Sequence, residues 1–322
     1  MKKNIAVIGC GYWGKNLVRN FSELGALSSI CDHSTEIANK YANQYNVKKN
    51  SFTEIINDPN IKGVVLAVPA HLHASMSLEV MNAGKHVLVE KPLAMNQVEA
   101  ESMIAAAKKN DVHLMVGHLL QYHSIFKTIR KIVNAGEIGE LNYVYSNRLS
   151  FGKVRSEEDV IWSFAPHDIS MILSLTNQYP ELVTTSSASI LQKNIVDTAT
   201  IHLAFKSGLK SHISVSWLHP YKEHKLVVIG KTAMLVFDDT KVWNEKLALH
   251  SYEVASTKKL INLNKSDVKY LEVIEDEPLK NECQHFIDVV EKDIQPLTGG
   301  AEGLRVVKVL NAASLSQNKK NI

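Results

Sequence analysis

An apolar run that ends in three spaced glycines constrains this chain more than any other feature of its sequence. The run Ile5–Ile8 is followed by Gly9, Gly11 and Gly14. Gly9 permits a tight turn, Gly11 lets the backbone approach a pyrophosphate, and Gly14 lets the next helix pack closely on its strand. The first turn of that helix offers unpaired N–H groups and the positive end of its dipole to phosphates. The spacing therefore predicts a strand, a loop and a helix that bind a dinucleotide.

Three neighbouring features separate this motif from an ordinary glycine turn. A strand precedes it, an amphipathic helix follows it, and a second short apolar run closes at Asp32. The helical stripe consists of Leu17, Val18, Phe21 and Leu24. We expect Tyr12 and Trp13, which stand inside the loop, to contact the cofactor together with the three glycines.

Asp32 indicates which dinucleotide is bound. A carboxylate at the end of the second strand accepts hydrogen bonds from the ribose hydroxyls of the adenosine and repels a 2′-phosphate placed there. His33 and Ser34 follow, and no arginine stands beside the carboxylate to hold such a phosphate. The sequence therefore predicts NAD as the cofactor. The alternative is a surface aspartate in a strand-to-helix turn.

Length, composition and charge exclude several other classes of protein. The 322 residues are too many for one typical core and indicate two domains. An apolar content of 45% is ordinary for a globular chain, and no apolar run approaches the roughly 20 residues of a membrane span. The net charge of +3 provides no bulk attraction to nucleic acid. We expect neither a membrane nor a nucleic acid as partner.

The cysteines and the start of the chain predict a cytoplasmic protein. The three cysteines, at positions 10, 31 and 283, are an odd number at unrelated spacings, which favours reduced thiols. Met1–Asn4 leads directly into the first strand, so we expect no secretory signal.

Apolar strands alternate with helical patterns through the first 120 residues or so. The expected strands are 63–68, 86–89 and 112–116, and the expected helices are 74–83 and 96–109. Near-continuous apolar strands fit a parallel sheet that is buried on both faces. Residues 1–120 are therefore predicted to form an NAD-binding Rossmann domain of α/β class with a doubly wound parallel sheet.

The pattern changes after residue 120. A helix is expected at 123–134 and two more at 279–292 and 302–317. Between them, apolar residues alternate with polar ones along two strands: Ile201, Leu203, Phe205 and Ile213, Val215, Trp217. The opposite faces carry Thr198, Thr200, His202, His212, Ser214 and Ser216, which suit water or a subunit interface. Residues 121–322 are predicted to form an α+β domain for substrate binding and oligomerisation, with a mostly antiparallel, open-faced sheet.

The segment Glu90-Lys91-Pro92, at the end of a predicted parallel strand, is the most specific motif of the chain. Together with the turn 67–73 and the ending 303–307, it resembles the Gfo/Idh/MocA oxidoreductases. The resemblance implies that Lys91 lies beside the reacting carbon and the nicotinamide, and that Glu90 belongs to the cofactor site. A cationic amine beyond a strand's carboxyl end suits the stabilisation of a developing alkoxide. The alternative for Lys91 is a solvated surface lysine.

A second segment, residues 160–170, resembles the substrate helix of the same family. The resemblance assigns His167 as general acid and base, a role that suits an imidazole with a pKa of about 6.5. The family usually places an aspartate four residues earlier, where this chain has Ser163. The departure shifts more of the proton transfer to His167 and Lys91. A structural histidine remains the alternative.

Other residues join the candidate site through their position. Pro69 and His73 lie in the turn after the fourth strand and are expected to shape the nicotinamide site, while His118 and Tyr122 lie near the domain junction, where substrates are held. The histidines do not predict zinc, because no cysteine accompanies them at ligand spacing and hydride transfer needs no metal.

The loop before the substrate helix points to a class of substrate. It carries Arg148, Lys153 and Arg155, and resembles the nucleotide-sugar branch of the family, the UDP-N-acetylglucosamine 3-dehydrogenases. These cations suit a diphosphate. The following acids, at 157–159, could instead pair with them in a solvated loop.

The resemblance thus implies NAD-dependent oxidation of the 3-hydroxyl of UDP-N-acetylglucosamine by a homo-oligomer, a dimer or tetramer, as a step toward cell-surface polysaccharide or lipid A sugars. Three alternatives stay open: a UDP-N-acetylglucosaminuronate 3-dehydrogenase, a cyclitol or free-sugar dehydrogenase, and a non-catalytic regulator that senses nucleotides. Retention of both Lys91 and His167 argues against the last of these.

Overall fold

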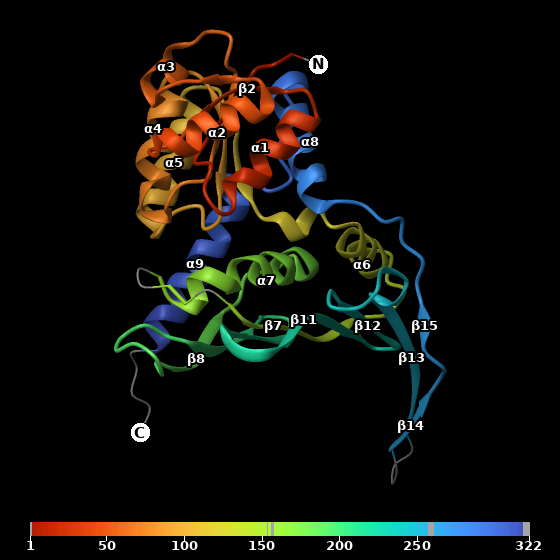
Figure 1. Cartoon of the computed structure of the whole chain (residues 1–322). Coiled ribbons are helices and arrows are strands. Elements are labelled where there is room, and N and C mark those ends of the chain that lie inside the picture. Colours follow the sequence, from red (N-terminus) through yellow and green to blue (C-terminus); the bar gives the residue numbers. More distant parts are fainter. Residues whose placement is uncertain (1, 153, 156–157, 257–260, 318–322) are drawn as a thin grey trace. The chain divides into compact units, whose positions relative to one another are not determined.

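The chain folds into two compact units, each built on one sheet (Figure 1). The computed structural model describes residues 2–152, 154–155, 158–256 and 261–317. The first unit comprises Met1–Tyr122 and Glu277–Lys308, and the second comprises His123–Asp276 and Val309–Ile322.

Six parallel strands form the sheet of the first unit, in the order β3-β2-β1-β4-β5-β6. They are β1 (Ile5–Ile8), β2 (Leu27–Cys31), β3 (Lys48–Lys49), β4 (Gly63–Leu66), β5 (His86–Glu90) and β6 (Leu114–Gly117). This order is that of doubly wound dinucleotide-binding folds, whose ligands lie beyond the carboxyl ends of the strands where the order reverses, here between β1 and β4. The predicted parallel sheet is confirmed.

Helices connect and cover these strands. They are α1 (Gly14–Glu23), α2 (Thr35–Tyr45), α3 (Phe52–Asn57), α4 (His73–Asn82) and α5 (Gln97–Lys109), with short 3₁₀ helices at Ala70–Leu72 and Leu119–Tyr122. The expected helices 74–83 and 96–109 are confirmed to within one residue. The side chain of Asn96 caps α5 by accepting the Glu99 N–H at 2.9 Å, and two lysines close it at the negative end of its dipole.

The apolar stripe of α1 builds the core of the first unit. Leu17, Val18 and Phe21 are fully buried in the same cluster as the strand residues Ile5 and Val7. Burying one side chain of this size stabilises the fold by about 1.5–3 kcal/mol. The stripe therefore sets the start of α1 directly beyond the end of β1.

Helix α8 (Pro278–Lys292) belongs to the first unit, although the sequence pattern suggested a second domain running from residue 121 to the end of the chain. Its Phe286 packs edge-on against Phe21 of α1, with ring centroids 6.2 Å apart. The physical reason for this placement is an apolar face, including Cys283 and Ile287, that completes the core of the Rossmann sheet.

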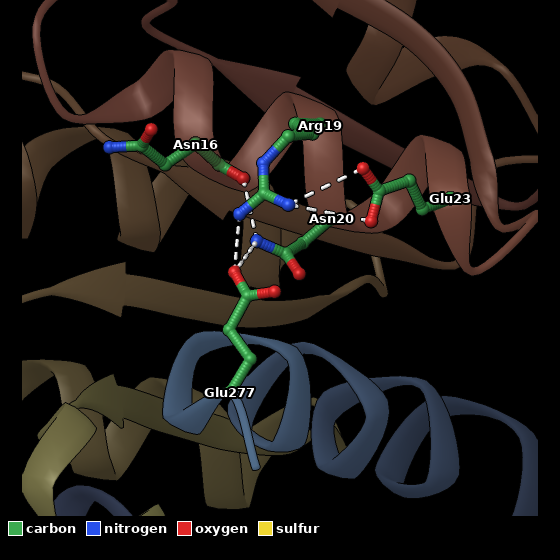
Figure 2. A network of polar contacts seen from close by, with 5 residues as sticks. All are labelled: Asn16, Arg19, Asn20, Glu23 and Glu277. Carbon is green, nitrogen blue, oxygen red and sulfur yellow. Dashed lines mark hydrogen bonds and ion pairs between the residues drawn. The ribbon is translucent and has the colours of Figure 1, made fainter. Parts of the chain in front are cut away.

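A polar network fastens the start of α8 to α1, as Figure 2 shows. Arg19 donates to the carboxylate of Glu277, which also accepts from Asn20 Nδ2 at 3.3 Å. Arg19 pairs with Glu23 as well, and Asn20 donates to the Asn16 carbonyl at 3.0 Å. The hydrogen bond from Arg19 lowers the pKa of Glu277. The returning segment is thus held by the helix that follows the glycine loop.

The second unit is a mixed, mostly antiparallel sheet in the order β14-β13-β12-β11-β7-β10-β9-β8, with β15 paired to β13. The strands are β7 (Leu141–Phe151), β8 (Leu182–Ala188), β9 (Thr198–Ala204), β10 (Lys210–Ser216), β11 (Leu218–Gly230), β12 (Ala233–Asp238), β13 (Leu247–Ser256), β14 (Ile261–Lys265) and β15 (Lys269–Tyr270). Strands β7 and β10 form its parallel pair. The expected α+β architecture is confirmed.

Helices α6 (Ser124–Asn134) and α7 (Val160–Thr176) cover one face of this sheet, and α9 (Gly300–Gln317) continues from the first unit into the second. Ile201, Ile213 and Val215 are fully buried on the covered face. None of the helices in the described residues combines the length and the apolar character that crossing a bilayer requires.

The opposite face of the sheet carries an aromatic cluster that the polar pattern did not predict. His212 stacks on Tyr145 with ring centroids 5.0 Å apart, and its Nδ1 lies 2.8 Å from the hydroxyl of Tyr143. His202, opposite His212 in the register, is exposed. The face therefore combines aromatic rings with the expected polar side chains.

Candidate functional site

At two positions of the glycine loop that follows β1, neighbouring backbone atoms leave no room for a side chain. Gly9 has φ +89°, and a Cβ there would stand 2.3 Å from the carbonyl oxygen of Ala67. A Cβ on Gly14 would stand 1.9 Å from the carbonyl oxygen of Gly9. The first turn of α1 therefore lies directly against the loop, as close packing of helix and strand requires.

Gly11 lacks such neighbours, because a Cβ added there would meet nothing within 4 Å. No side chain caps the start of α1, and no acidic residue lies in its first turn. Open space, a helix start without a side-chain cap and the positive end of the helix dipole are what a pyrophosphate needs. These residues fit the NAD that the sequence predicts.

Asp32 has a second task besides the expected contact with ribose. Its carboxylate accepts the N–H of Cys10 at 2.7 Å and the N–H of Ser34 at 2.8 Å, and its side chain is only 4% exposed. The carboxylate thus ties the glycine loop to the end of β2. An ionised oxygen has further lone pairs, so these bonds leave it able to accept from a hydroxyl.

Trp13 joins the glycine loop to the end of β5. Its indole N–H donates to the carboxylate of Glu90, whose other oxygen accepts the backbone N–H of Lys91 at 3.2 Å. Tyr12, next to Trp13, is 85% exposed. The glycine loop and the segment Glu90-Lys91-Pro92 therefore meet through one carboxylate.

A second acid, Glu282, interacts with Glu90 at this meeting point. Burial raises the pKa of Glu90, against the opposing effects of Trp13 and Lys91. Glu282 of α8 is 1% exposed, and burial, followed by the charge of Glu90, raises its pKa well above the ordinary value. Glu282 could not be recognised from the sequence, because nothing in its spacing separates it from the solvated acids of an amphipathic helix.

His73 connects the carboxyl ends of β4 and β5. The ring is 1% exposed, and its two nitrogens lie 2.7 Å from the carbonyl oxygen of Pro92 and 3.0 Å from that of Val68. The peptide bond between Lys91 and Pro92 is cis. Pro69 is exposed and precedes the 3₁₀ turn. His73 therefore links the backbone segments that follow β4 and β5, next to the switch point between β1 and β4.

The two residues expected to bind substrate after β6 have partners inside the first unit. His118 is 1% exposed, and its Nδ1 lies 2.6 Å from a carboxylate oxygen of Glu302. Tyr122 belongs to the hydrophobic core, with its hydroxyl 2.9 Å from that of Thr298. Burial raises the pKa of Tyr122. The structure gives Tyr122 a packing role, because its ring fills the space beneath α8.

Helix α7 carries His167 and, one turn earlier, Ser163. Asp159 caps the helix by accepting the N–H of Trp162 at 3.1 Å. Most of α7 is buried, including Ser163, whereas His167 is only half-buried. Residues four apart share one helix face, so Ser163 and His167 point in a similar direction.

Arg148 is engaged with a residue that the sequence analysis did not single out. Its Nε lies 2.5 Å from one carboxylate oxygen of Asp168, and its Nη2 lies 3.1 Å from the other. Ser146 also donates to Asp168, which is 1% exposed. Arg148, which the sequence suggested as a phosphate ligand, therefore donates two of its N–H groups to an internal carboxylate.

Arg155 lies within the loop and is half-exposed, with a 2.5 Å ion pair to Glu158. This contact matches the alternative in which the loop's bases pair with the acids that follow. Its backbone carbonyl accepts from Gln192 at 3.0 Å. Lys153 lies outside the described residues. Within the described residues no group of three or more His, Cys, Asp or Glu side chains gathers closely enough to hold a metal ion.

Comparisons with known proteins agree with this geometry. Residues 3–118 match the model of an oxidoreductase family with an NAD-binding Rossmann fold, and residues 126–236 match the GFO/IDH/MocA C-terminal domain. The myo-inositol 2-dehydrogenase of Thermotoga maritima is 24% identical over 98% of this chain and 96% of its own. The UDP-N-acetylglucosamine 3-dehydrogenase of Acidithiobacillus ferrooxidans is 26% identical over 65% of this chain and 66% of its own.

A solved structure of the Acidithiobacillus ferrooxidans enzyme shares the fold, with a TM-score of 0.85, 20% identity and coverage of 98% of both chains. An aldose-aldose oxidoreductase from Caulobacter crescentus superposes as well, with a TM-score of 0.86, 19% identity and coverage of 100% of this chain and 99% of that one. Proteins named for different hydroxylated substrates thus share this architecture.

Proposed function

Because this chain belongs to the Gfo/Idh/MocA oxidoreductase family, we propose that it is an NAD-dependent dehydrogenase that oxidises the 3-hydroxyl of UDP-N-acetylglucosamine to a ketone. The observation that carries the proposal is the hydrogen bond from Trp13 to Glu90. It joins the glycine loop to the segment that ends in Lys91. The cofactor loop and the catalytic amine therefore share one edge of one sheet, where such folds bind their ligands.

The chemistry divides between the cofactor and two side chains. Bound NAD supplies the acceptor for a hydride. As hydride leaves carbon 3, the hydroxyl on that carbon must lose its proton, and we assign His167 as the base that takes it. The Lys91 ammonium stabilises the negative charge that develops on the oxygen.

The substrate assignment rests on cations in the loop after β7 and on a named relative. Arg155, together with Lys153, would bind the diphosphate, and Ser163 and His118 would contact the sugar. The relative named as a UDP-N-acetylglucosamine 3-dehydrogenase supports this choice. We place the reaction in the cytoplasm, because Cys10, Cys31 and Cys283 are free thiols.

A second candidate is a cyclitol or free-sugar dehydrogenase. The ion pair between Arg148 and Asp168 favours it, because it removes one cation from those expected to hold a diphosphate. The myo-inositol 2-dehydrogenase relative also covers nearly the entire chain. Both candidates use the same catalytic pair and differ only in what binds the remote part of the substrate.

Product analysis tests the substrate. Incubation with NAD and UDP-N-acetylglucosamine should give a product lighter by two hydrogens, with the new carbonyl at carbon 3, as read by mass spectrometry. Free N-acetylglucosamine should lose turnover as well as affinity, because binding of the remote diphosphate positions the reacting carbon. Oxidation of the uronic acid alone would move the assignment to UDP-N-acetylglucosaminuronate, and oxidation of cyclitols alone would exclude a nucleotide sugar.

Asp32 should make the chain prefer NAD over NADP by at least about tenfold. Two unit charges 4 Å apart repel by about 1 kcal/mol in water and about 4 kcal/mol near a protein surface. Asp32→Ala should narrow the ratio of the two dissociation constants. It should also weaken NAD binding, because the bonds to Cys10 and Ser34 are lost.

Titration calorimetry with both cofactors measures this ratio. Asp58→Ala, in the turn before β4, is the control and should leave the ratio unchanged. Equal or tighter binding of NADP by the unmodified chain would contradict the role given to Asp32.

We also propose that the open face of the second sheet joins two copies of the chain in a dimer or tetramer. The half-exposed cluster of Tyr143, Tyr145 and His212 supports this, since interfaces are enriched in aromatic rings. His202→Asp should shift the mass measured by light scattering at micromolar concentration toward that of a monomer. The exposed control Val98→Asp on α5 should not. A monomeric unmodified chain would exclude the assembly.

A further inference from the structure

We propose that Asp168 is a positioning residue: through Arg148 and Ser146 it fixes the turn of α7 that carries His167 to strand β7. The inference rests on the proposed function in one respect, the assignment of His167 as the base. It adds a residue that acts on the reaction without touching substrate, and it changes the role of Arg148 from ligand to anchor.

The register of β7 places both donors opposite the helix. Ser146 and Arg148 are two residues apart, so their side chains leave the same face of the strand, which is the face that α7 covers. On the helix, Asp168 directly follows His167, about 100° further around the axis. A bond that holds Asp168 against the sheet therefore determines where His167 points.

The bonds to Asp168 constrain both its position and its rotation. Arg148 engages both carboxylate oxygens, at 2.5 Å through Nε and 3.1 Å through Nη2, and Ser146 donates to the second oxygen. A planar guanidinium that binds a carboxylate at two points permits little rotation. The apolar neighbours of Asp168 on α7 pack against the sheet, but apolar contacts are non-directional and do not fix the rotation of the helix.

The helix needs such an anchor where His167 stands. Pro166 lies inside α7 and has no N–H, so the carbonyl of Trp162 lacks its regular helical donor. A turn without one of its backbone bonds is free to bend. The paired Asp168 lies two residues beyond that missing bond and ties the same turn to the sheet.

The surroundings keep the ion pair intact near neutral pH. His224 of β11 is the cross-strand neighbour of Arg148. Burial, followed by the charges of Arg148 and Lys222, lowers the pKa of His224 to about 4. The imidazole is therefore uncharged at neutral pH and does not compete with Arg148 for the Asp168 carboxylate.

An anchor and a phosphate ligand predict different kinetics. If Arg148 acts through Asp168, removing either partner lowers kcat for every substrate and leaves inhibition by UDP unchanged. If Arg148 binds the diphosphate, its removal weakens UDP inhibition and raises KM, and the loss of Asp168 does neither.

The test uses the full chain with Asp168→Asn, Arg148→Gln and the double variant. Asp288→Asn is the matched control, because Asp288 pairs with Lys292 on the surface of α8, in the other unit. Each single variant should lower kcat by about 10²-fold, the effect expected of a misplaced catalytic group, with KM changed less than about twofold. The double variant should be no slower than either single variant, because the two residues act as one unit.

Two conservative variants separate geometry from charge and guard against misfolding. Arg148→Lys keeps the charge but loses the two-point contact, and should remain as slow as Arg148→Gln. Ser146→Ala removes one donor and should lower kcat by about tenfold in a folded protein, as checked by its melting temperature. Full kcat in Arg148→Lys, or wild-type kcat in Asp168→Asn, would overturn the proposal.

A measurement without substrate keeps this proposal separate from the proposed function. Amide hydrogen exchange should accelerate over residues 163–170 in Asp168→Asn and stay unchanged in Asp288→Asn. If the wild-type chain oxidises no UDP-sugar, the substrate assignment fails and the exchange result still decides the anchor. Unchanged exchange over 163–170, or UDP inhibition weakened in Arg148→Gln alone, would overturn it.

Discussion

Lys91→Met leaves the affinity for NAD within about twofold of the unmodified chain and lowers kcat by about 10²–10⁴-fold, the range expected when a positioned acid, base or charge is removed. Methionine keeps the length of the side chain and removes its charge. The backbone N–H of residue 91 still donates to Glu90, so the link from this segment to Trp13 persists. The charge that develops on the substrate oxygen loses its stabilising cation.

His167→Asn should produce a loss of the same order through a different step. Asparagine can still form hydrogen bonds but cannot take a proton near neutral pH. The decrease in kcat of His167→Asn should therefore become smaller at high pH, where hydroxide replaces the missing base. The decrease in kcat of Lys91→Met should persist there.

Absorbance of NADH at 340 nm measures turnover, and calorimetry measures the affinity for NAD. Lys62→Met is the matched control, because Lys62 is exposed directly before β4, at the opposite end of the strands from Lys91. It should leave both quantities unchanged. Wild-type turnover in Lys91→Met or in His167→Asn would remove that residue from the catalytic assignment.

Gly14→Ala should lower the stability of the fold and Gly11→Ala should not, although both alter the glycine motif. At Gly14 the new methyl group would stand 1.9 Å from the Gly9 carbonyl oxygen. Gly9 cannot yield, because its φ of +89° and the hydrogen bond from its N–H to Cys31 at 2.8 Å hold it in place. Helix α1 must therefore shift away from its strand.

We expect Gly14→Ala to lower the free energy of unfolding by about 3 kcal/mol, the upper part of the range for overpacked sites. This corresponds to a fall in melting temperature of roughly 6–12 °C for a unit of this size. NAD binding should be lost with it, because the start of α1 forms the expected phosphate site.

Gly11→Ala should leave the melting temperature unchanged and weaken NAD binding by at least about tenfold. The new methyl group meets no protein atom within 4 Å, so the fold tolerates it. It would occupy the space that the pyrophosphate needs. Thermal unfolding and calorimetry on both variants check the pair of predictions. A Gly11→Ala protein that binds NAD as tightly as the unmodified chain would show that the cofactor does not approach this residue.

The Rossmann sheet could be predicted because its information is local. The apolar runs, the glycine spacing and the acid at Asp32 each specify a conformation over a few residues, and the structure confirms the parallel sheet they predict. The alternation around Ile201 and Ile213 likewise indicated the antiparallel sheet of the second unit. Steric and hydrogen-bonding rules act within short segments, so the pattern of residues suffices for them.

The partners of a polar or apolar face could not be predicted in the same way. The apolar stripe of α8 shows that the helix covers a core, but only the contact of Phe286 with Phe21 shows which core. Tyr122 looked like a substrate ligand by position, and its ring fills the interior instead. An amphipathic pattern specifies that a face is buried and leaves open which surface buries it.

Arg148 is the clearest example of a side chain whose partner could not be predicted from the sequence. The residues alone show that a cation stands in a basic segment ahead of the helix that carries His167, and they indicate the family and the cofactor through motifs whose chemistry is local. Only the folded chain shows that Asp168, twenty residues later, accepts hydrogen bonds from two donor groups of Arg148. An ion pair depends on the distance between charges in space, and that distance is set by how α7 lies on the sheet, which no local pattern of residues records.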